Sequence, residues 1–290
     1  MFEIAARAKI NLFLNVLDRR PDGYHGLVTI MQNISLADTL RLAPGDEAPR
    51  VTYKDCVTCD FHDDLVLRAW KALTDETGSD MTFNAEVFKR IPVAAGLGGG
   101  SADAAAALLG LNKMFDLGLT KNRLRELAAG IGADVPFFIT GGTMLAEGAG
   151  EILSTAPAMP DCRIVVIKPE VDISTGRAYQ DYDDFPDDRE PADAAPTLTA
   201  LKNGDYEALC ASLFNSFEPA MFAKHPEIAD IKEATLSAGA DAALMSGSGS
   251  TVFALTRSEA VEEKIADAAG RHGAKIFFAE PCNTAVTGLD

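Results

Sequence analysis

The stretch Ile91-Pro92-Val93-Ala94-Ala95-Gly96-Leu97-Gly98-Gly99-Gly100-Ser101 leads directly into an Ala/Leu-rich segment. That composition predicts a helix from Ser101 to about Phe115. Glycines allow the main chain to approach a ligand closely. The free N–H groups and the positive dipole end at a helix start favour phosphate. The stretch therefore predicts a phosphate-binding loop, and the plain alternative is a flexible loop with Ser101 as a helix cap.

Two familiar phosphate loops are excluded by the spacing of these glycines. The sequence contains no G-x-x-x-x-G-K-[ST] motif, which excludes a Walker-type loop. Ser101 occupies the last glycine position of a G-x-G-x-x-G pattern, which argues against a dinucleotide-binding loop.

Three further segments contain residues suited to phosphoryl transfer. In Gly132-Ala133-Asp134-Val135-Pro136, a turn of small residues could hold Asp134 at a cleft as a base, or Asp134 could simply be a cap or turn residue. Ala8-Lys9-Ile10-Asn11 places a cation on an opening strand, although a lone strand lysine is usually solvated. Ser246-Gly247-Ser248-Gly249-Ser250 is a second glycine loop or a plain hairpin turn. Together they match the needs of phosphoryl transfer, which are positioning, charge neutralisation and a base.

The overall charge restricts the class of partner. The 290 residues carry a formal net charge of -17, and 47% of them are hydrophobic. Such a surface repels phosphate backbones and anionic lipids, so we expect neither nucleic acid nor membrane partners. No basic leader or long apolar run is present, which predicts a cytoplasmic protein. A bound polyanion would need a local positive field, which the glycine loop could supply.

Strands and helices are mixed without regular alternation, which predicts an α+β fold. The first ninety residues are strand-like except for a helix from about Asp63, and residues 181–195 read as an acidic solvated loop. Further helices are expected near Thr120, 205–217, 226–238 and from Ser258, with strands at 163–167, 242–245, 251–255 and 275–279. We divide the chain into two domains, 1–157 and 158–290.

The cysteines raise the question of a metal site. Cys56 and Cys59 form a C-x-x-C with His62 close by, but no second spaced pair completes the four ligands that zinc requires. We expect free thiols and no structural metal.

Taken in order, the Lys9 segment, the glycine loop, Gly132–Pro136 and Ser246–Ser250 resemble the GHMP kinases. The segments Ala8–Leu14 and Arg20-Pro21-Asp22-Gly23-Tyr24-His25 are similar to the branch that acts on 4-diphosphocytidyl-2-C-methyl-D-erythritol. The resemblance extends from residue 5 to about 255. It implies a two-domain fold with the active site in the cleft between domains. It also implies ATP-dependent phosphorylation of the substrate's 2-hydroxyl in the non-mevalonate isoprenoid pathway, with Mg²⁺ expected alongside ATP.

The resemblance also implies a role for each matching residue. Asp134 matches a catalytic aspartate and Lys9 its partner lysine. Asn11 and Thr175 match the substrate-binding set, while Tyr24 and Tyr179 would stack on both faces of the cytosine and His25 would hydrogen-bond it. The ATP-binding set is Pro92, Val93, Ala94, Ala95, Gly96, Leu97, Gly98, Gly99, Gly100, Ser101 and Ala102. No residue matches a metal ligand.

Some positions differ from the family pattern. Ala94-Ala95 stand where glycines are common, Ala102-Asp103 where Ser-Asn is common, and Asp64 where an Asn often contacts adenine. Other readings are a homoserine or mevalonate kinase, a catalytically dead nucleotide-binding protein, or an acidic interaction protein. Tyr24, His25 and Tyr179 argue against the first, the retained Lys9 and Asp134 against the second, and the glycine loops against the third.

Overall fold

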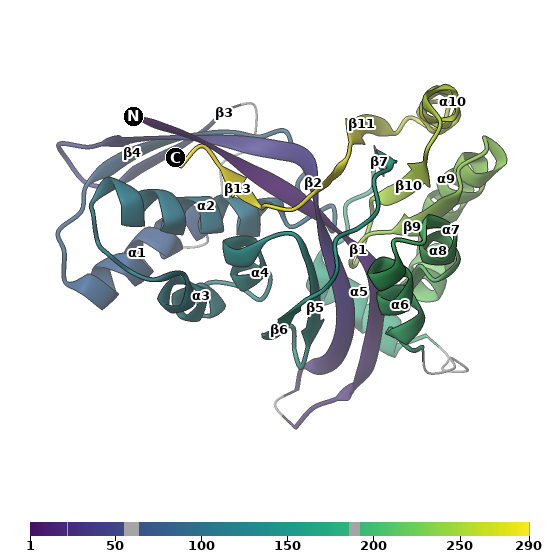
Figure 1. The fold of residues 1–290 in the computed structure, drawn as a ribbon, viewed down its shortest axis with the longest axis horizontal. Helices are drawn as coiled ribbons and strands as arrows, with labels where there is room; N and C mark the ends of the chain where they lie inside the picture. Colours follow the sequence, from purple (N-terminus) through teal and green to yellow (C-terminus); the bar gives the residue numbers. More distant parts are fainter. Residues whose placement is uncertain (22, 55–63, 186–191, 290) are drawn as a thin grey trace.

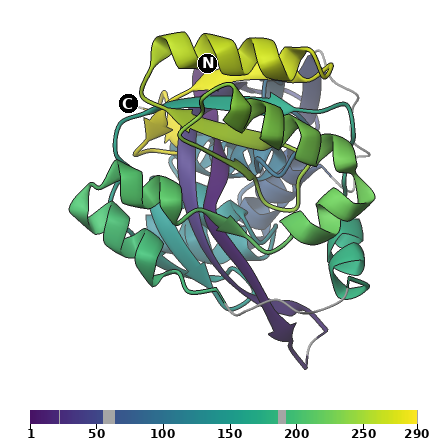
Figure 2. The ribbon, with the colours of Figure 1, turned by 90° about the vertical axis from the view of Figure 1, so that its right-hand side faces the viewer.

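Two long antiparallel strands, β1 (Phe2–Arg19) and β2 (His25–Pro44), form the frame of the molecule. The computed structural model describes residues 1–21, 23–54, 64–185 and 192–289. Both strands run from one half of the molecule into the other, and their hairpin projects at one edge (Figures 1 and 2). The strand-like character expected of this part of the sequence is confirmed by these two strands. Side chains 8–16 of β1 are buried on both faces, because elements pack on both sides of this strand.

The first sheet has the order β13-β1-β2-β4-β3, and its other strands branch from β1 and β2. Its strands include β3 (Arg50–Lys54), β4 (Phe83–Phe88), β5 (Thr143–Glu147), β6 (Ile152–Thr155) and β8 (Phe214–Asn215). Four helices pack against it: α1 (Leu65–Thr77), α2 (Gly99–Met114), α3 (Lys121–Ala129) and α4 (Val135–Thr140). The buried side chains of α2 are mostly alanines, so this helix lies close to the sheet.

The second sheet is antiparallel, in the order β11-β7-β10-β9. Its strands are β7 (Arg163–Lys168), β9 (Ala242–Met245), β10 (Val252–Thr256) and β11 (Lys275–Ala279). The helices of this half are α5 (Thr175–Asp183), α6 (Ala195–Asn203), α7 (Tyr206–Ala211), α8 (Glu218–Lys224), α9 (Pro226–Ser237) and α10 (Glu259–Gly270). Mixed helices and two sheets confirm the α+β prediction.

Several predicted boundaries are wrong for identifiable reasons. Asp64 caps α1 by accepting from the N–H groups of Val66 and Leu67, so this helix begins at Leu65. Helix α2 begins at Gly99 rather than Ser101. The helix predicted over 205–217 is instead α7 followed by strand β8, because β8 pairs with β1. The loop predicted at 181–195 is shorter, since α5 extends to Asp183.

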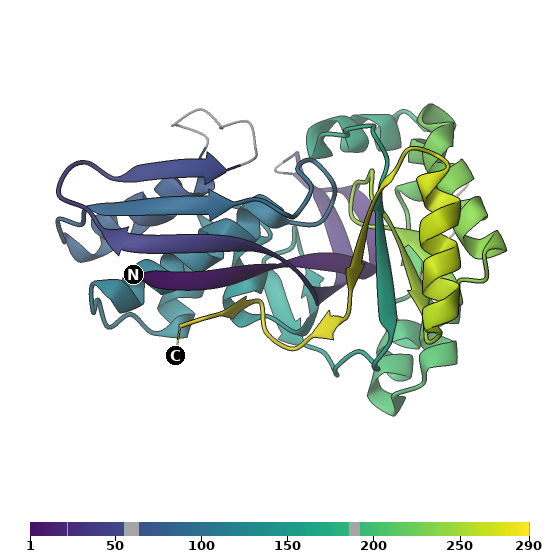
Figure 3. The same cartoon turned by 90° about the horizontal axis from the view of Figure 1, so that it is seen from above.

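The end of the described chain returns to the first sheet. Strand β12 (Pro281–Cys282) pairs with β2, and β13 (Val286–Thr287) pairs with β1 (Figure 3). The division near residue 157 falls between β6 and β7 and stays a prediction.

None of the helices in the described ranges is long and apolar enough to cross a membrane. The cytoplasmic location stays a prediction. Cys56, Cys59 and His62 lie outside the described residues.

Candidate active site

A cavity of about 810 Å³ lies where the two halves meet. Its walls come from β1, β2, the segment before α2, the start of α4, the start of α5 and the Gly247-Ser248 turn. The predicted residues gathered there are Lys9, Asn11, Tyr24, His25, Pro92, Val93, Ala94, Ala95, Gly96, Leu97, Gly98, Gly99, Gly100, Ser101, Asp134, Thr175 and Tyr179. Ala102, by contrast, is fully buried in the core on the other side of α2.

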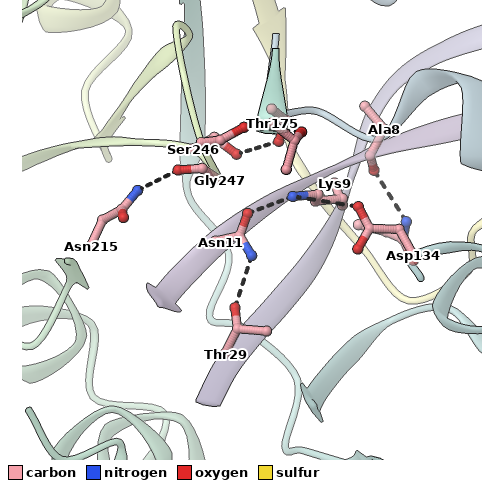
Figure 4. Close-up of polar contacts among 12 residues, drawn as sticks. Ala8, Lys9, Asn11, Thr29, Asp134, Thr175, Asn215, Ser246 and Gly247 are labelled. Carbon is pink, nitrogen blue, oxygen red and sulfur yellow. Dashed lines mark hydrogen bonds and ion pairs between the residues drawn. The ribbon is translucent and has the colours of Figure 1, made fainter. Parts of the chain in front are cut away.

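Lys9, Asn11 and Asp134 form a polar group at the centre of the cavity (Figure 4). The Lys9 Nζ atom donates to Asn11 Oδ1 at 2.6 Å and lies 4.0 Å from Asp134 Oδ2. Asn11 Nδ2 donates to Thr29 Oγ1 at 2.8 Å, and that hydroxyl donates to the Phe13 carbonyl at 2.7 Å. This chain of hydrogen bonds fixes the amide orientation of Asn11, and so aims its oxygen at the ammonium.

Exposure distinguishes the two charged residues. The Lys9 side chain is 5% exposed and that of Asp134 is 40% exposed. Burial lowers the pKa of Lys9, and the negative charge of Asp134 partly opposes that change. Asp134 therefore presents its carboxylate to a ligand, while Lys9 lies behind it, where burial disfavours its charged form and Asp134 favours it.

The first turn of α2 opens on this cavity. Its N-cap is Gly98, with a φ of +70° and no side-chain hydrogen bond to the helix, whereas Asp64 and Thr120 cap α1 and α3. The first N–H groups of a helix have no partner within the helix, so an anion can bind them. Ala94 also has a positive φ, of +50°, which residues other than glycine rarely adopt.

The two glycine loops contact each other. Ser246 Oγ donates to the Gly96 carbonyl at 2.9 Å, and a Cβ at Gly96 would lie 2.0 Å from the Ser246 carbonyl oxygen. Asn215 Nδ2 holds the second loop by donating to the carbonyls of Met245 and Gly247, at 2.7 and 2.8 Å. Asn215 is not among the predicted site residues, because residues 205–217 were predicted to be a helix.

The opposite end of the cavity is aromatic. The His25 ring stacks on Tyr179 with centroids 5.4 Å apart, and its Nδ1 contacts the Leu17 carbonyl at 2.8 Å. Burial, followed by the nearby charge of Asp134, raises the pKa of Tyr179 to about 12, so its phenol is neutral at ordinary pH. Tyr24 is 71% exposed at the rim. The cytosine sandwich between Tyr24 and Tyr179 stays a prediction.

A buried charged cluster behind the phosphate loop was not predicted. Lys89 Nζ donates to Asp38 Oδ2 and, at 2.6 Å, to Asp103 Oδ2, and both Lys89 and Asp103 line the cavity. Asp38 Oδ1 also accepts from the N–H groups of Arg90 and Ile91. The cluster thus ties the segment entering the loop to β2 and α2. No sequence spacing links these three residues, because the fold alone brings them together.

Asp103 is the member of this cluster with an unsatisfied oxygen atom. It is 2% exposed and its Oδ1 has no hydrogen-bond partner among the described residues. Burial raises its pKa to about 8, with Asp38 adding to the effect and Lys89 opposing it. Between roughly pH 4 and 8 the folded protein therefore holds a proton that the unfolded chain releases, and stability falls as pH rises through that window.

Asp103→Asn is expected to stabilise the protein progressively as pH rises from 5 to 8. An amide does not ionise, so the variant avoids the free-energy cost of ionising a buried carboxyl as pH rises. Lys89 retains Asp38 as a partner. We expect the free energy of unfolding of the variant, relative to wild type, to increase by at least about 1 kcal/mol over that range. Urea unfolding at both pH values measures this difference.

Asp38→Asn provides the contrast. This carboxylate accepts two backbone N–H groups as well as Lys89, so its replacement should destabilise the protein at both pH values. Parallel pH dependence of wild type and Asp103→Asn would contradict the assigned pKa.

Two protein-family models match this chain, one in each half of the molecule. Residues 64–142 match the family model described as GHMP kinases N terminal domain, and residues 197–275 match GHMP kinases C terminal. The chain is 42% identical over 265 residues to a 4-diphosphocytidyl-2-C-methyl-D-erythritol kinase of Geobacillus sp. (strain WCH70), covering 90% of each chain. It is 41% identical over 293 residues to the same kinase of Gloeobacter violaceus, covering 99% of this chain and 95% of that one.

Solved structures agree with the sequence relatives. A crystal structure of 4-(cytidine 5'-diphospho)-2C-methyl-D-erythritol kinase has a TM-score of 0.81 and 32% identity, covering 96% of this chain and 98% of the other. Homoserine kinase from Cytophaga hutchinsonii has a TM-score of 0.77 at 19% identity, covering 99% and 96%. At that identity the likeness shows the fold alone.

Proposed function

The chain belongs to the GHMP kinase family, and from this premise we propose that it phosphorylates 4-diphosphocytidyl-2-C-methyl-D-erythritol at its 2-hydroxyl with ATP. This reaction belongs to non-mevalonate isoprenoid precursor synthesis. One observation carries the proposal: a single cavity holds an uncapped helix start, the Lys9–Asp134 pair and the His25–Tyr179 stack. The helix start suits a triphosphate, the Lys9–Asp134 pair suits a reacting hydroxyl, and the His25–Tyr179 stack suits a nucleobase.

In the proposed mechanism Asp134 accepts the proton of the attacking hydroxyl. Its partly exposed carboxylate can reach a ligand, and Lys9 stabilises the developing alkoxide from the buried side. The glycine segment 96–100 and the first N–H groups of α2 hold the phosphates, so the γ-phosphoryl group faces Asp134. Asn11 keeps Lys9 in place, since its Oδ1 atom accepts a hydrogen bond from the ammonium group of Lys9.

Mg²⁺ is expected with ATP, because it neutralises the transferred phosphoryl group. Within the described ranges, no group of three or more His, Cys, Asp or Glu side chains is arranged to hold a metal ion. Phosphate oxygens and water are the ligands that Mg²⁺ would use here.

A coupled assay for ADP release tests the proposed substrate. The protein should turn over the cytidyl-diphosphate substrate and show no activity above background with homoserine or mevalonate. Turnover of either of those alcohols in preference to the cytidyl substrate would overturn the proposal.

Tyr24→Ala is expected to raise the KM of the cytidyl substrate about tenfold while leaving the KM of ATP unchanged. Stacking of a base on an aromatic ring contributes about 1–3 kcal/mol, and 1.4 kcal/mol corresponds to one decade of affinity. Tyr24 is exposed, so its removal should not affect folding. Steady-state kinetics with each substrate varied in turn measures both constants.

Phe278→Ala is the matched control, because it removes another exposed aromatic, on β11 of the second sheet. It should leave both KM values at wild-type levels. His25→Ala should weaken the preference for cytidine over uridine diphosphate, because hydrogen bonds rather than stacking distinguish those bases. A similar rise of both KM values in Tyr24→Ala would count against a cytosine site.

A further inference from the structure

Helix α5 presents one stripe of residues to the cavity and to the β1–β2 hairpin. Thr175 and Tyr179 belong to the proposed substrate site, and Asp183 follows at the same spacing of four residues. Residues four apart lie on one face of a helix. Asp183 therefore continues the stripe by one turn, to the point where α5 meets the hairpin.

Asp183 is joined to both strands of that hairpin. Arg19 Nη2 donates to its Oδ2 at 2.7 Å, and His25 Nε2 lies 3.0 Å from its Oδ1. Arg19 is at the end of β1 and His25 at the start of β2. A single carboxylate thus connects the two strand ends to the helix.

The same contacts define the position of the His25 ring. Its Nδ1 lies 2.8 Å from the Leu17 carbonyl oxygen, one face stacks on Tyr179, and Tyr182 meets it edge-on with centroids 6.0 Å apart. Its Nε2 lies 3.0 Å from Asp183 Oδ1 but makes no hydrogen bond among the described residues. The Nε2 atom is therefore available to a ligand, with the Asp183 carboxylate beside it. Without Asp183, α5 would lose its ionic contacts with both strand ends, and the ring would be held less firmly at this place.

The positive charge of Arg19 offsets the negative charge that Asp183 places near the cavity. The substrate carries a diphosphate, which an unpaired negative charge near the cavity would repel. Arg19 lines the cavity and compensates the charge of Asp183, although its side chain is 64% exposed and the pair alone contributes little to stability. The expected role of Asp183 is therefore orientation of a ligand-binding ring, with little effect on folding.

We propose that Asp183 is a positioning residue that fixes His25 for recognition of the cytosine of the substrate. This inference rests on the proposed function and deepens it. Asp183 does not act on the reacting hydroxyl, which lies at the Lys9–Asp134 end. Its loss should affect binding of the cytidyl end and spare the chemical step.

The test compares Asp183→Ala, Asp183→Asn and Asp184→Asn with wild type. Asp184 is the next residue, exposed at the end of α5, so its replacement removes the same charge from nearly the same place. Isothermal titration with CDP and with UDP measures base recognition without turnover, and steady-state kinetics gives both KM values and kcat. Thermal unfolding checks that each variant remains folded.

We expect Asp183→Ala to weaken CDP binding and raise the KM of the cytidyl substrate about tenfold, the effect of losing one charge-assisted contact. Asp183→Asn, which keeps the size but loses the charge, should show a smaller change in the same direction. The preference for CDP over UDP should fall in both, while kcat and the KM of ATP stay within about twofold. Asp184→Asn should match wild type.

Unchanged CDP affinity in both Asp183 variants would overturn this inference, as would an equal rise of the KM values for both substrates. A CDP-to-UDP preference that survives in Asp183→Ala would also overturn it. Failure of the proposed function looks different, because wild type itself would then neither bind CDP nor turn over the cytidyl substrate.

Discussion

Asp134→Asn is expected to reduce kcat by about 10²–10⁴, the usual contribution of a general base. The amide has nearly the same size but does not accept a proton from the substrate hydroxyl. The Asp134 side chain is 40% exposed and, although Asp134 is the N-cap residue of α4, its side chain makes no hydrogen bond to that helix, so the fold should be preserved. Single-turnover kinetics with saturating ATP measures the chemical step directly.

The affinity for ATP distinguishes loss of the general base from damage to the whole site. ATP affinity should remain close to wild type in Asp134→Asn, because the phosphate loop is on other elements. Asp134→Glu keeps the carboxylate at a shifted position and should recover part of the rate. A variant Asp134→Asn with near-normal kcat would show that transfer proceeds through a loose transition state without a base.

Gly98→Ala should weaken ATP binding about tenfold or more, even though only one methyl group is added. Gly98 has a φ of +70°, which L residues adopt at a cost of roughly 1–2 kcal/mol. A Cβ at this position would lie 2.8 Å from the Phe138 ring and 3.2 Å from Lys9 Cγ. The variant must therefore move the start of α2, the Phe138 ring or Lys9. Titration with ATP measures the loss.

Gly118→Ala separates the backbone cost from the local clash. Gly118 has the same φ of +70°, but no atom lies within 4 Å of its Cβ position. This control should lose a comparable amount of stability and keep its ATP affinity. Normal ATP binding by a well-folded Gly98→Ala, judged by circular dichroism, would show that the loop is not the phosphate cradle.

Local sequence predicted the elements around the cavity well where one segment carries the whole signal. The glycine loop, the helix after it and the strands around the second glycine loop are all found where expected. The onset of α2 was displaced, because glycines have weak helix propensity and Gly99 and Gly100 join the helix through the uncapped start at Gly98. Ser101 was therefore a misleading cap.

Tertiary contacts account for what the sequence did not reveal. Asn215 leaves the predicted helix because its amide holds the Met245 and Gly247 carbonyls. Lys89, Asp38 and Asp103 are brought together across β2, the end of β4 and α2. Asp183 had a usable signal, since it continues the four-residue spacing of Thr175 and Tyr179, but the acidic composition around it pointed to a loop.

The return of the final strands to the first sheet has a consequence for biosynthesis. Arg7 N donates to the Ala285 carbonyl at 2.8 Å, and Ala285 N would lie only 2.4 Å from a Cβ at Gly141, directly after α4. A ribosome releases β1 and α4 long before residues 281–287 emerge. The layer that carries Lys9 and Asp134 therefore keeps an open edge until residues 281–287 have emerged. Until then the unpaired backbone groups of that edge are exposed to other strands and to chaperones.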